Sequence, residues 1–163
     1  MPDGTTHRLI GTGGGAIFAA YKAKDQTVEN WIAEIAGGAM GGYVGGILPD
    51  ILEPAVSSWH RGIAHSCAAG ATVVTGANQV LSKWEAACRA KAENCKAIQL
   101  ITVANGVFVP APADPIRQLV SGLAELFWRL MAGFLNGLVA GYLSHVALDG
   151  VTPRSIPLLT NGW

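Results

Sequence analysis

The chain is poor in charged residues, which make up only 13% of its 163 positions, about half the share typical of a soluble domain. Basic and acidic residues number 11 each, so no basic excess indicates nucleic-acid binding. Cysteine is scarce too, and the three cysteines form no CxxC pair, so we interpret Cys67, Cys88 and Cys95 as free thiols. Half of the residues are hydrophobic and 21 are glycine. This composition favours an integral membrane protein.

Neither a signal peptide nor a dinucleotide-binding motif is predicted near the N-terminus. Residues 1–8 are polar and lack the basic start of a secretory signal peptide, so we expect no cleaved leader. Residues 11–16 formally match the G-x-G-x-x-G/A dinucleotide fingerprint. No strand precedes them and no βαβ alternation follows, so we interpret these glycines as helix-packing positions.

The hydropathy pattern predicts an all-α fold, because no segment shows strand-like alternation with turn signals. Ser82 and Glu85 have capping-box spacing and predict the start of a separate, solvated polar helix over 83–96. Residues 97–111 are apolar but short for a membrane span, so we expect a tilted, re-entrant or buried segment. Apolar helices are expected over residues 9–20, 31–48, 62–81 and 115–149.

Glycine recurs every four residues in two of these apolar runs, forming three ladders: Gly37, Gly41 and Gly45; Gly38, Gly42 and Gly46; and Gly133, Gly137 and Gly141. In water each glycine would cost a helix about 1 kcal/mol relative to alanine. In lipid, small residues let two helices approach closely. The ladders therefore predict a membrane-integral bundle of four or five helices with Gly-xxx-Gly packing. We expect one domain over 1–163, with homo-oligomerisation through the glycine-rich helices as a further expectation.

Polar residues gather where the glycine ladders end. His145 and Asp149 are four residues apart, so they share one helix face. Gly45 precedes Asp50 and Gly141 precedes His145 by four or five residues. If the ladders pack against each other, these acids and histidines come together at one end of the bundle.

The order of the helices brings the other histidines to that same end. His7 begins the first helix, whereas His60 and Arg61 precede the third helix and His65 begins it. Ionisable groups in or beside a membrane are costly and usually functional. We therefore expect a metal site formed by His7, Asp50, His65, His145 and Asp149. The residues that we expect to complete the site or take part in catalysis are Glu53, His60 and Arg61.

Nitrogen and oxygen donors in this mixture suit Zn²⁺ better than Mn²⁺ or Fe²⁺. Three protein ligands and an open position would lower the pKa of a water ligand towards neutrality, and the candidate ligands suffice for one or two ions. Arg61 could hold a phosphate oxygen, although pairing with Asp50 or Glu53 is an equally consistent interpretation. Ser66 and Ser144, each beside a histidine, fit caps or backbone-bonded hydroxyls better than nucleophiles.

Several blocks of the chain resemble the YdjM-type (LexA-binding, inner membrane-associated) metal-dependent hydrolases. They are Thr6-His7, LPDILEP at 48–54, HRGIAHS at 60–66, and GYLSHVALDGVTP at 141–153. The resemblance implies metal-ligand roles for the motif residues, His60 included, and a location in the bacterial inner membrane. The family often has PDxD, whereas Leu52 stands at the second aspartate position here and Glu53 follows it.

The His145-x-x-x-Asp149 spacing is also similar to a ligand pair of bacterial zinc-dependent phospholipase C, which suggests a phosphoester substrate. We therefore expect a membrane-bound metal-dependent hydrolase that acts on a phosphoester in a small molecule or a lipid through a metal-activated water. The alternative is a non-enzymatic membrane protein whose His/Asp cluster is structural or binds metal only to staple helices together. A transporter fits less well, because the candidate ligands lie at helix ends rather than midway along them.

Overall fold

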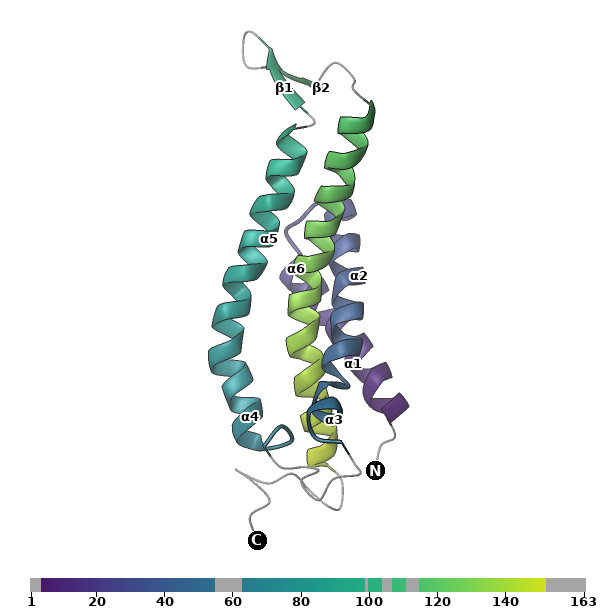
Figure 1. The fold of residues 1–163 in the computed structure, drawn as a ribbon, viewed down its shortest axis with the longest axis vertical. Coiled ribbons are helices and arrows are strands. Elements are labelled where there is room, and N and C mark those ends of the chain that lie inside the picture. Colours follow the sequence, from purple (N-terminus) through teal and green to yellow (C-terminus); the bar gives the residue numbers. More distant parts are fainter. Residues whose placement is uncertain (1–3, 55–62, 99, 104–106, 111–114, 152–163) are drawn as a thin grey trace.

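The computed structural model describes residues 4–54, 63–98, 100–103, 107–110 and 115–151. Long helices run side by side in it (Figure 1): α1 (Gly4–Lys22), α2 (Val28–Gly45), α5 (Asn78–Ile98) and α6 (Pro115–Gly150). The shorter helical elements are α3 (Leu48–Leu52), α4 (Cys67–Thr72) and the π-helix η1 (Val73–Ala77). Strands β1 (Leu100–Val103) and β2 (Val107–Pro110) lie between α5 and α6. The predicted helical architecture is confirmed for all of the described chain except this pair of strands.

The glycine ladders bring α2 into backbone contact with a helix on each of two faces. A Cβ atom added at Gly37, Gly41 or Gly45 would collide with the backbone of α6. The glycine ladder of α6 is packed against the backbone of α2 in the same way, because a Cβ atom at Gly137 would collide with the Gly38 carbonyl. On the other face, a Cβ atom at Gly42 would collide with the Gly11 backbone of α1. The predicted close packing of the ladders is therefore confirmed, and α2 packs against both α1 and α6, which also contact each other.

Many large apolar side chains lie on the outside of these helices, whereas small and polar side chains make up much of the interior. Leu9, Ile17, Ile32 and Met40 are all more than half exposed. The largest fully buried side chains are instead Arg129, His65, His145, Glu34, Pro49 and Ser66. In a soluble domain the large apolar residues would be the buried ones. The distribution fits helices surrounded by lipid.

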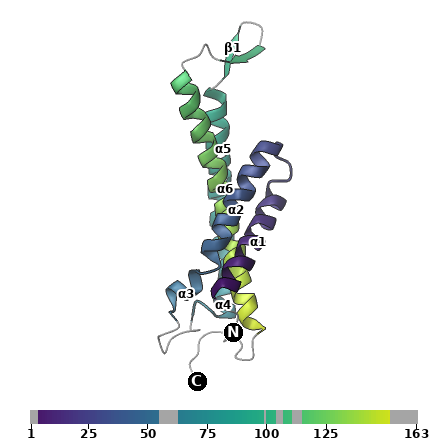
Figure 2. The same ribbon diagram turned by 90° about the vertical axis from the view of Figure 1, so that its right-hand side faces the viewer.

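Within the part of the chain that the structure describes, two helical stretches are long and apolar enough to cross a membrane: residues 28–52, which comprise α2 and α3, and residues 115–150, which form α6. Near one end of the bundle, α1 begins, α2 and α6 end, and α3 and α4 lie close by (Figure 1). At the other end, α5 and α6 extend beyond the turn that joins α1 to α2, as Figure 2 shows. The predicted arrangement of helix ends is confirmed.

The boundaries of α2 and α5 differ from those predicted. Helix α2 ends at Gly45, and Pro49 and Asp50 lie in α3 instead of stopping the previous helix. Proline is tolerated there because the first turn of a helix needs no bond from its nitrogen. The predicted break at Ser82 is also absent, since α4, η1 and α5 follow one another directly and α5 begins at Asn78.

The polar helix α5 is not solvated all round, contrary to our expectation. Its Arg89 guanidinium donates to the wholly buried Glu34 carboxylate of α2, with Nη2–Oε2 and Nε–Oε1 distances of 2.6 and 3.0 Å. Glu85 pairs with Arg89 and with Lys22 of α1. Buried Arg129 of α6 pairs with Glu93 and lies 3.7 Å from Glu34. Charge pairing therefore attaches α5 to the glycine-packed helices.

The segment predicted to be a tilted, re-entrant or buried apolar stretch contains a β-hairpin instead. Strands β1 and β2 are antiparallel, with Leu100 opposite Pro110 and Val103 opposite Val107. The strands are rich in β-branched residues, which favour extended backbone. Asn105-Gly106 stands between them in the sequence. This dipeptide is a strong short-range hairpin signal, and it outweighs the apolar character from which a buried segment was predicted.

Candidate metal centre

The site is built at the end of the bundle where the ladders stop. His7 lies in the first turn of α1, Asp50 lies in α3, and His145 and Asp149 lie in the last turns of α6. His65 immediately precedes Ser66, the N-cap of α4, whose hydroxyl accepts a hydrogen bond from Ala69 N. The structure thus brings together all five histidines and aspartates that we predicted to form the metal site.

His145 is fully buried and has a fixed orientation. Its Nδ1 lies 2.6 Å from the Gly46 carbonyl oxygen, which can only accept, so Nδ1 carries the proton. Nε2 faces the centre of the cluster, and it offers a lone pair there whenever the ring is neutral. Gly46 belongs to the glycine ladder that packs against α1. The packing of α1 on this ladder therefore also positions the Gly46 carbonyl, which orients the His145 ring.

His65 is oriented by a carboxylate in the same manner. Its Nδ1 lies 3.0 Å from Glu53 Oε2, and the other oxygen of Glu53 accepts from Ala64 N at 2.8 Å. Nε2 of His65 therefore faces inward and lies 3.3 Å from Nε2 of His145. Two lone pairs at this distance repel each other unless a positive charge, either a cation or an additional proton, lies close to both.

The aspartates flank this pair of nitrogens. Asp50 Oδ1 lies 3.3 Å from His65 Nε2 and 3.6 Å from His145 Nε2. Asp149 Oδ2 lies 3.7 and 3.4 Å from the same two atoms. Donors bound about 2.0–2.1 Å from a tetrahedral Zn²⁺ are about 3.3 Å apart. The donor types and their separations therefore fit a Zn²⁺-sized cation.

His7 extends the cluster on the other side of His145. The two rings are stacked, with centroids 3.8 Å apart and planes 18° from parallel. His7 Nε2 lies 3.5 Å from Asp149 Oδ1, so the two oxygens of Asp149 face different histidines. Nδ1 of His7 is buried without a hydrogen-bond partner among the described residues. The other ring nitrogen, Nε2, is the one beside the Asp149 carboxylate, and it is therefore the His7 atom placed to share a cation with that carboxylate.

Among the residues that the structure describes, two overlapping sets of donors could each hold a metal ion. His7, His145 and Asp149 form one set, and Asp50, His65 and His145 form the other, with the donor atoms of each set within 4.8 Å of one another. Burial, followed by the neighbouring His145 ring, lowers the pKa of His7, which precedes both candidate spans. His7 is therefore neutral near pH 7, the state that metal ligation requires.

Of the three residues that we expected to complete the site or take part in catalysis, the structure describes only Glu53. Glu53 lies behind His65 with both oxygens engaged, a position suited to orienting that ring. His60 and Arg61 lie outside the described residues. Ser66 and Ser144 donate to the carbonyls of Ile63 and Gly141, as expected of backbone-bonded hydroxyls.

Tyr142 is a supporting residue of the site that we did not predict from the sequence. Its hydroxyl donates to the Ala64 carbonyl at 2.6 Å, which ties α6 to the segment that carries His65. A signal for it exists, because Tyr142 precedes His145 by three residues and so lies on the same face of α6. The sequence does not identify Ala64 as the partner of Tyr142, because a hydrogen bond to a backbone carbonyl leaves no pattern in the residue types.

These features define a class: a helical membrane protein with a buried cluster of histidine and aspartate donors at one end of its bundle. The chain belongs to the YdjM inner membrane protein family, which it matches over residues 1–160. Comparisons with curated proteins and with solved structures found no match. Family membership and the two candidate spans place the protein in a membrane.

Proposed function

We propose that this protein is a membrane-embedded hydrolase that depends on a divalent cation and acts on a phosphoester. The observation that carries the proposal is the pair of imidazole Nε2 atoms, 3.3 Å apart, between the carboxylates of Asp50 and Asp149. Nitrogen and oxygen donors in this combination suit Zn²⁺, with Mn²⁺ and Fe²⁺ as the less favoured ions.

The residues that would hold the cation are His65, His145, Asp50 and Asp149, with His7 completing this site or contributing to a second one. A divalent cation bound there would supply Lewis acidity and would make hydroxide available near neutral pH. The carboxylates would repel a phosphate anion without a cation, so binding of a phosphoester and of metal are coupled in this proposal.

The chain's own residues would prepare the site in two ways. The Gly46 carbonyl and the Glu53 carboxylate hold the imidazoles of His145 and His65 with their lone pairs directed inward. The side chain of Asp50 is 39% exposed, whereas those of His65 and Asp149 are exposed by 4% or less. A substrate would therefore approach from the Asp50 side. Arg61 remains our proposed anion-binding residue.

The test begins with metal content and turnover of the detergent-purified protein. We expect one or two zinc ions per chain by elemental analysis, and hydrolysis of p-nitrophenyl phosphate or bis(p-nitrophenyl) phosphate. His145→Ala should lose the metal and reduce turnover on the order of 100-fold or more. Ser144→Ala is the matched control, because the Ser144 hydroxyl donates to the Gly141 carbonyl of its own helix and is not one of the proposed ligands.

The rival function, a metal staple without catalysis, is favoured by one observation. The donors come from α1, α3, the residue before the α4 cap, and α6, so a bound cation would join segments far apart in the sequence. A protein that binds zinc stoichiometrically and hydrolyses neither phosphoester would support the staple. A folded protein free of metal, in buffer supplied with zinc, would refute both functions.

A further inference from the structure

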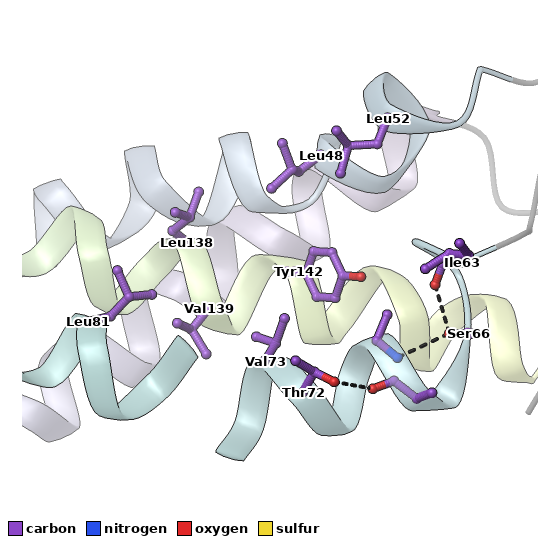
Figure 3. Close-up of a pocket in the computed structure, with 12 residues that line it drawn as sticks. Leu48, Leu52, Ile63, Ser66, Thr72, Val73, Leu81, Leu138, Val139 and Tyr142 are labelled. Atoms are coloured by element: carbon purple, nitrogen blue, oxygen red, sulfur yellow. Dashed lines mark hydrogen bonds between the residues drawn. The ribbon is translucent and has the colours of Figure 1, made fainter. Parts of the chain in front are cut away.

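A cavity of about 640 Å³ lies between α3, α4, η1 and α6, with Leu81 of α5 at one side (Figure 3). Its lining is almost entirely aliphatic, with Leu48 and Leu52 on one side and Leu138 and Val139 along α6. Its volume lies within the range of roughly 300–1,000 Å³ that is usual for small-molecule sites.

The few hydroxyl groups of the lining are directed to the backbone and do not serve a polar ligand. Ser66 donates to Ile63 O at 2.7 Å, Thr72 donates to Ala68 O at 2.9 Å, and Tyr142 donates to Ala64 O at 2.6 Å. Two of these bonds are drawn in Figure 3. A polar guest would therefore lose its hydrogen bonds to water without replacing them, whereas a hydrocarbon guest would lose nothing.

The cavity begins where the metal donors end. Ser66 follows His65 in the chain, and Tyr142 lies one helical turn before His145. Leu52 stands between Asp50 and Glu53, and its side chain is 60% exposed at the rim. An apolar chamber thus adjoins a charged centre, and the rim beside Asp50 is open to the surroundings, which in this protein include lipid.

We propose that this cavity binds one acyl chain of a phosphate-containing lipid, whose phosphoester then lies at the His/Asp centre. This inference rests on the proposed function for the position of the phosphoester. The occupant is a lipid chain for three reasons. The protein lies in a membrane, the lining is almost entirely apolar with its hydroxyls bonded to the backbone, and the polar centre next to it suits the headgroup of the same molecule.

A direct binding test does not require turnover. The probe is phosphatidic acid with a photoactivatable diazirine in its acyl chain, presented to the full-length protein in detergent micelles. We expect crosslinks in peptides that contain residues 66–73 and 138–142, in both the wild type and His145→Ala. Excess unlabelled phosphatidic acid should abolish these crosslinks.

The matched variants are Ala69→Phe, which fills the cavity, and Ala71→Phe, which adds the same ring at an exposed position of α4 outside the lining. Ala69→Phe should reduce cavity crosslinking and phosphatidic acid hydrolysis about tenfold. Its hydrolysis of p-nitrophenyl phosphate and its zinc content should remain at the wild-type level. Ala71→Phe should behave as the wild type in all four measurements.

The two proposals fail in distinguishable ways. Competable cavity crosslinking without hydrolysis of any phosphoester would retain the lipid site and refute the hydrolase. Normal phosphatidic acid hydrolysis by Ala69→Phe, or crosslinks spread over the outer faces of α1 and α2, would overturn the lipid site and leave the hydrolase standing. Should Ala69→Phe fail to fold, Val73→Phe replaces it in the same assays.

Discussion

At the scale of single residues, His65 and His145 each use Nδ1 to donate a hydrogen bond away from the site. Their acceptors differ: a carbonyl of α2 serves His145, whereas the Glu53 carboxylate serves His65. Groups behind a metal ligand fix its tautomer and raise its basicity. In the proposed metal site, Glu53 would therefore add to metal affinity by orienting His65, without contacting the metal itself.

Glu53→Gln tests this role, because the two side chains have the same shape. The amide oxygen can still accept from Ala64 N, which leaves the NH₂ group facing Nδ1 of His65. His65 must then carry its proton on Nε2, where it blocks ligation. We expect zinc affinity to fall about 10–100-fold, measured by competition with a chromogenic chelator. Glu29→Gln, at an exposed position of α2, is the control. Equal affinities in the two variants would show that the tautomer of His65 is set by something else.

At the scale of helices, the close contact of α2 with α6 holds His145 beside the Gly46 carbonyl that orients its ring. Gly137 of α6 leaves no room for a methyl group, because a Cβ atom there would overlap the Gly38 carbonyl. Gly122 lies on the same helix, and a Cβ atom there would meet nothing within 4 Å. The two glycines offer a matched pair of positions in which only the packing differs.

Gly137→Ala should separate α2 from α6 and reduce stability by about 1–3 kcal/mol, the usual cost of overpacking. Gly122→Ala should leave stability unchanged or increase it by up to about 1 kcal/mol, because alanine favours helix. Thermal unfolding of the detergent-solubilised variants, monitored by circular dichroism, measures the difference. Zinc affinity should fall in Gly137→Ala alone. Equal melting temperatures of Gly137→Ala and Gly122→Ala would contradict the prediction, because they would show that the α2–α6 contact accommodates a methyl group without loss of stability.

The same elements show what can be predicted from sequence. The ladders are readable because a spacing of four residues places glycine on one helix face whatever the partner is. Their ends therefore place Asp50 near His145 without knowledge of the loops. The role of Glu53 and the partner of Tyr142 depend on the path from α3 to α4, and no periodicity encodes that path. The continuity of α4 with α5 escapes prediction because Ser82 and Glu85 have the spacing of a capping box, although the chain is helical through both residues.

The partial burial of α5, at Glu85, Cys88 and Ala92, escapes prediction for a different reason. Its charges look like a solvated face when the helix is read alone. Arg89 and Glu34 are 55 residues apart, so their pairing is invisible to any local pattern. In the assembled protein, Glu34 is the one acid in the second apolar run and Arg89 balances its charge. A buried acid inside an apolar run indicates that a distant cation exists, but does not identify it.

At the scale of the whole molecule, the candidate centre joins segments that lie at opposite ends of the chain. His7 and Asp149 are separated by almost the full sequence, yet their side chains are 3.5 Å apart. Without a cation, the site holds carboxylates and facing lone pairs that repel one another. Metal binding should therefore stabilise the entire bundle, because the unfolded chain cannot present these donors together.

Removing the metal is the corresponding experiment. Dialysis against a chelator should lower the melting temperature of the wild type, and added zinc should restore it; at a free zinc concentration 100 times the Kd, the stabilisation is about 2.7 kcal/mol. His145→Ala should melt at one temperature with and without zinc, because it lacks the donor shared by both sets of ligands. This comparison distinguishes a cation held by the cluster from zinc bound elsewhere on the protein.

If the melting temperature of His145→Ala still depended on zinc, the stabilising zinc would be bound at a site other than this cluster. Zinc-independent melting of the wild type would instead mean that an additional proton, shared by His65 and His145, balances the carboxylates.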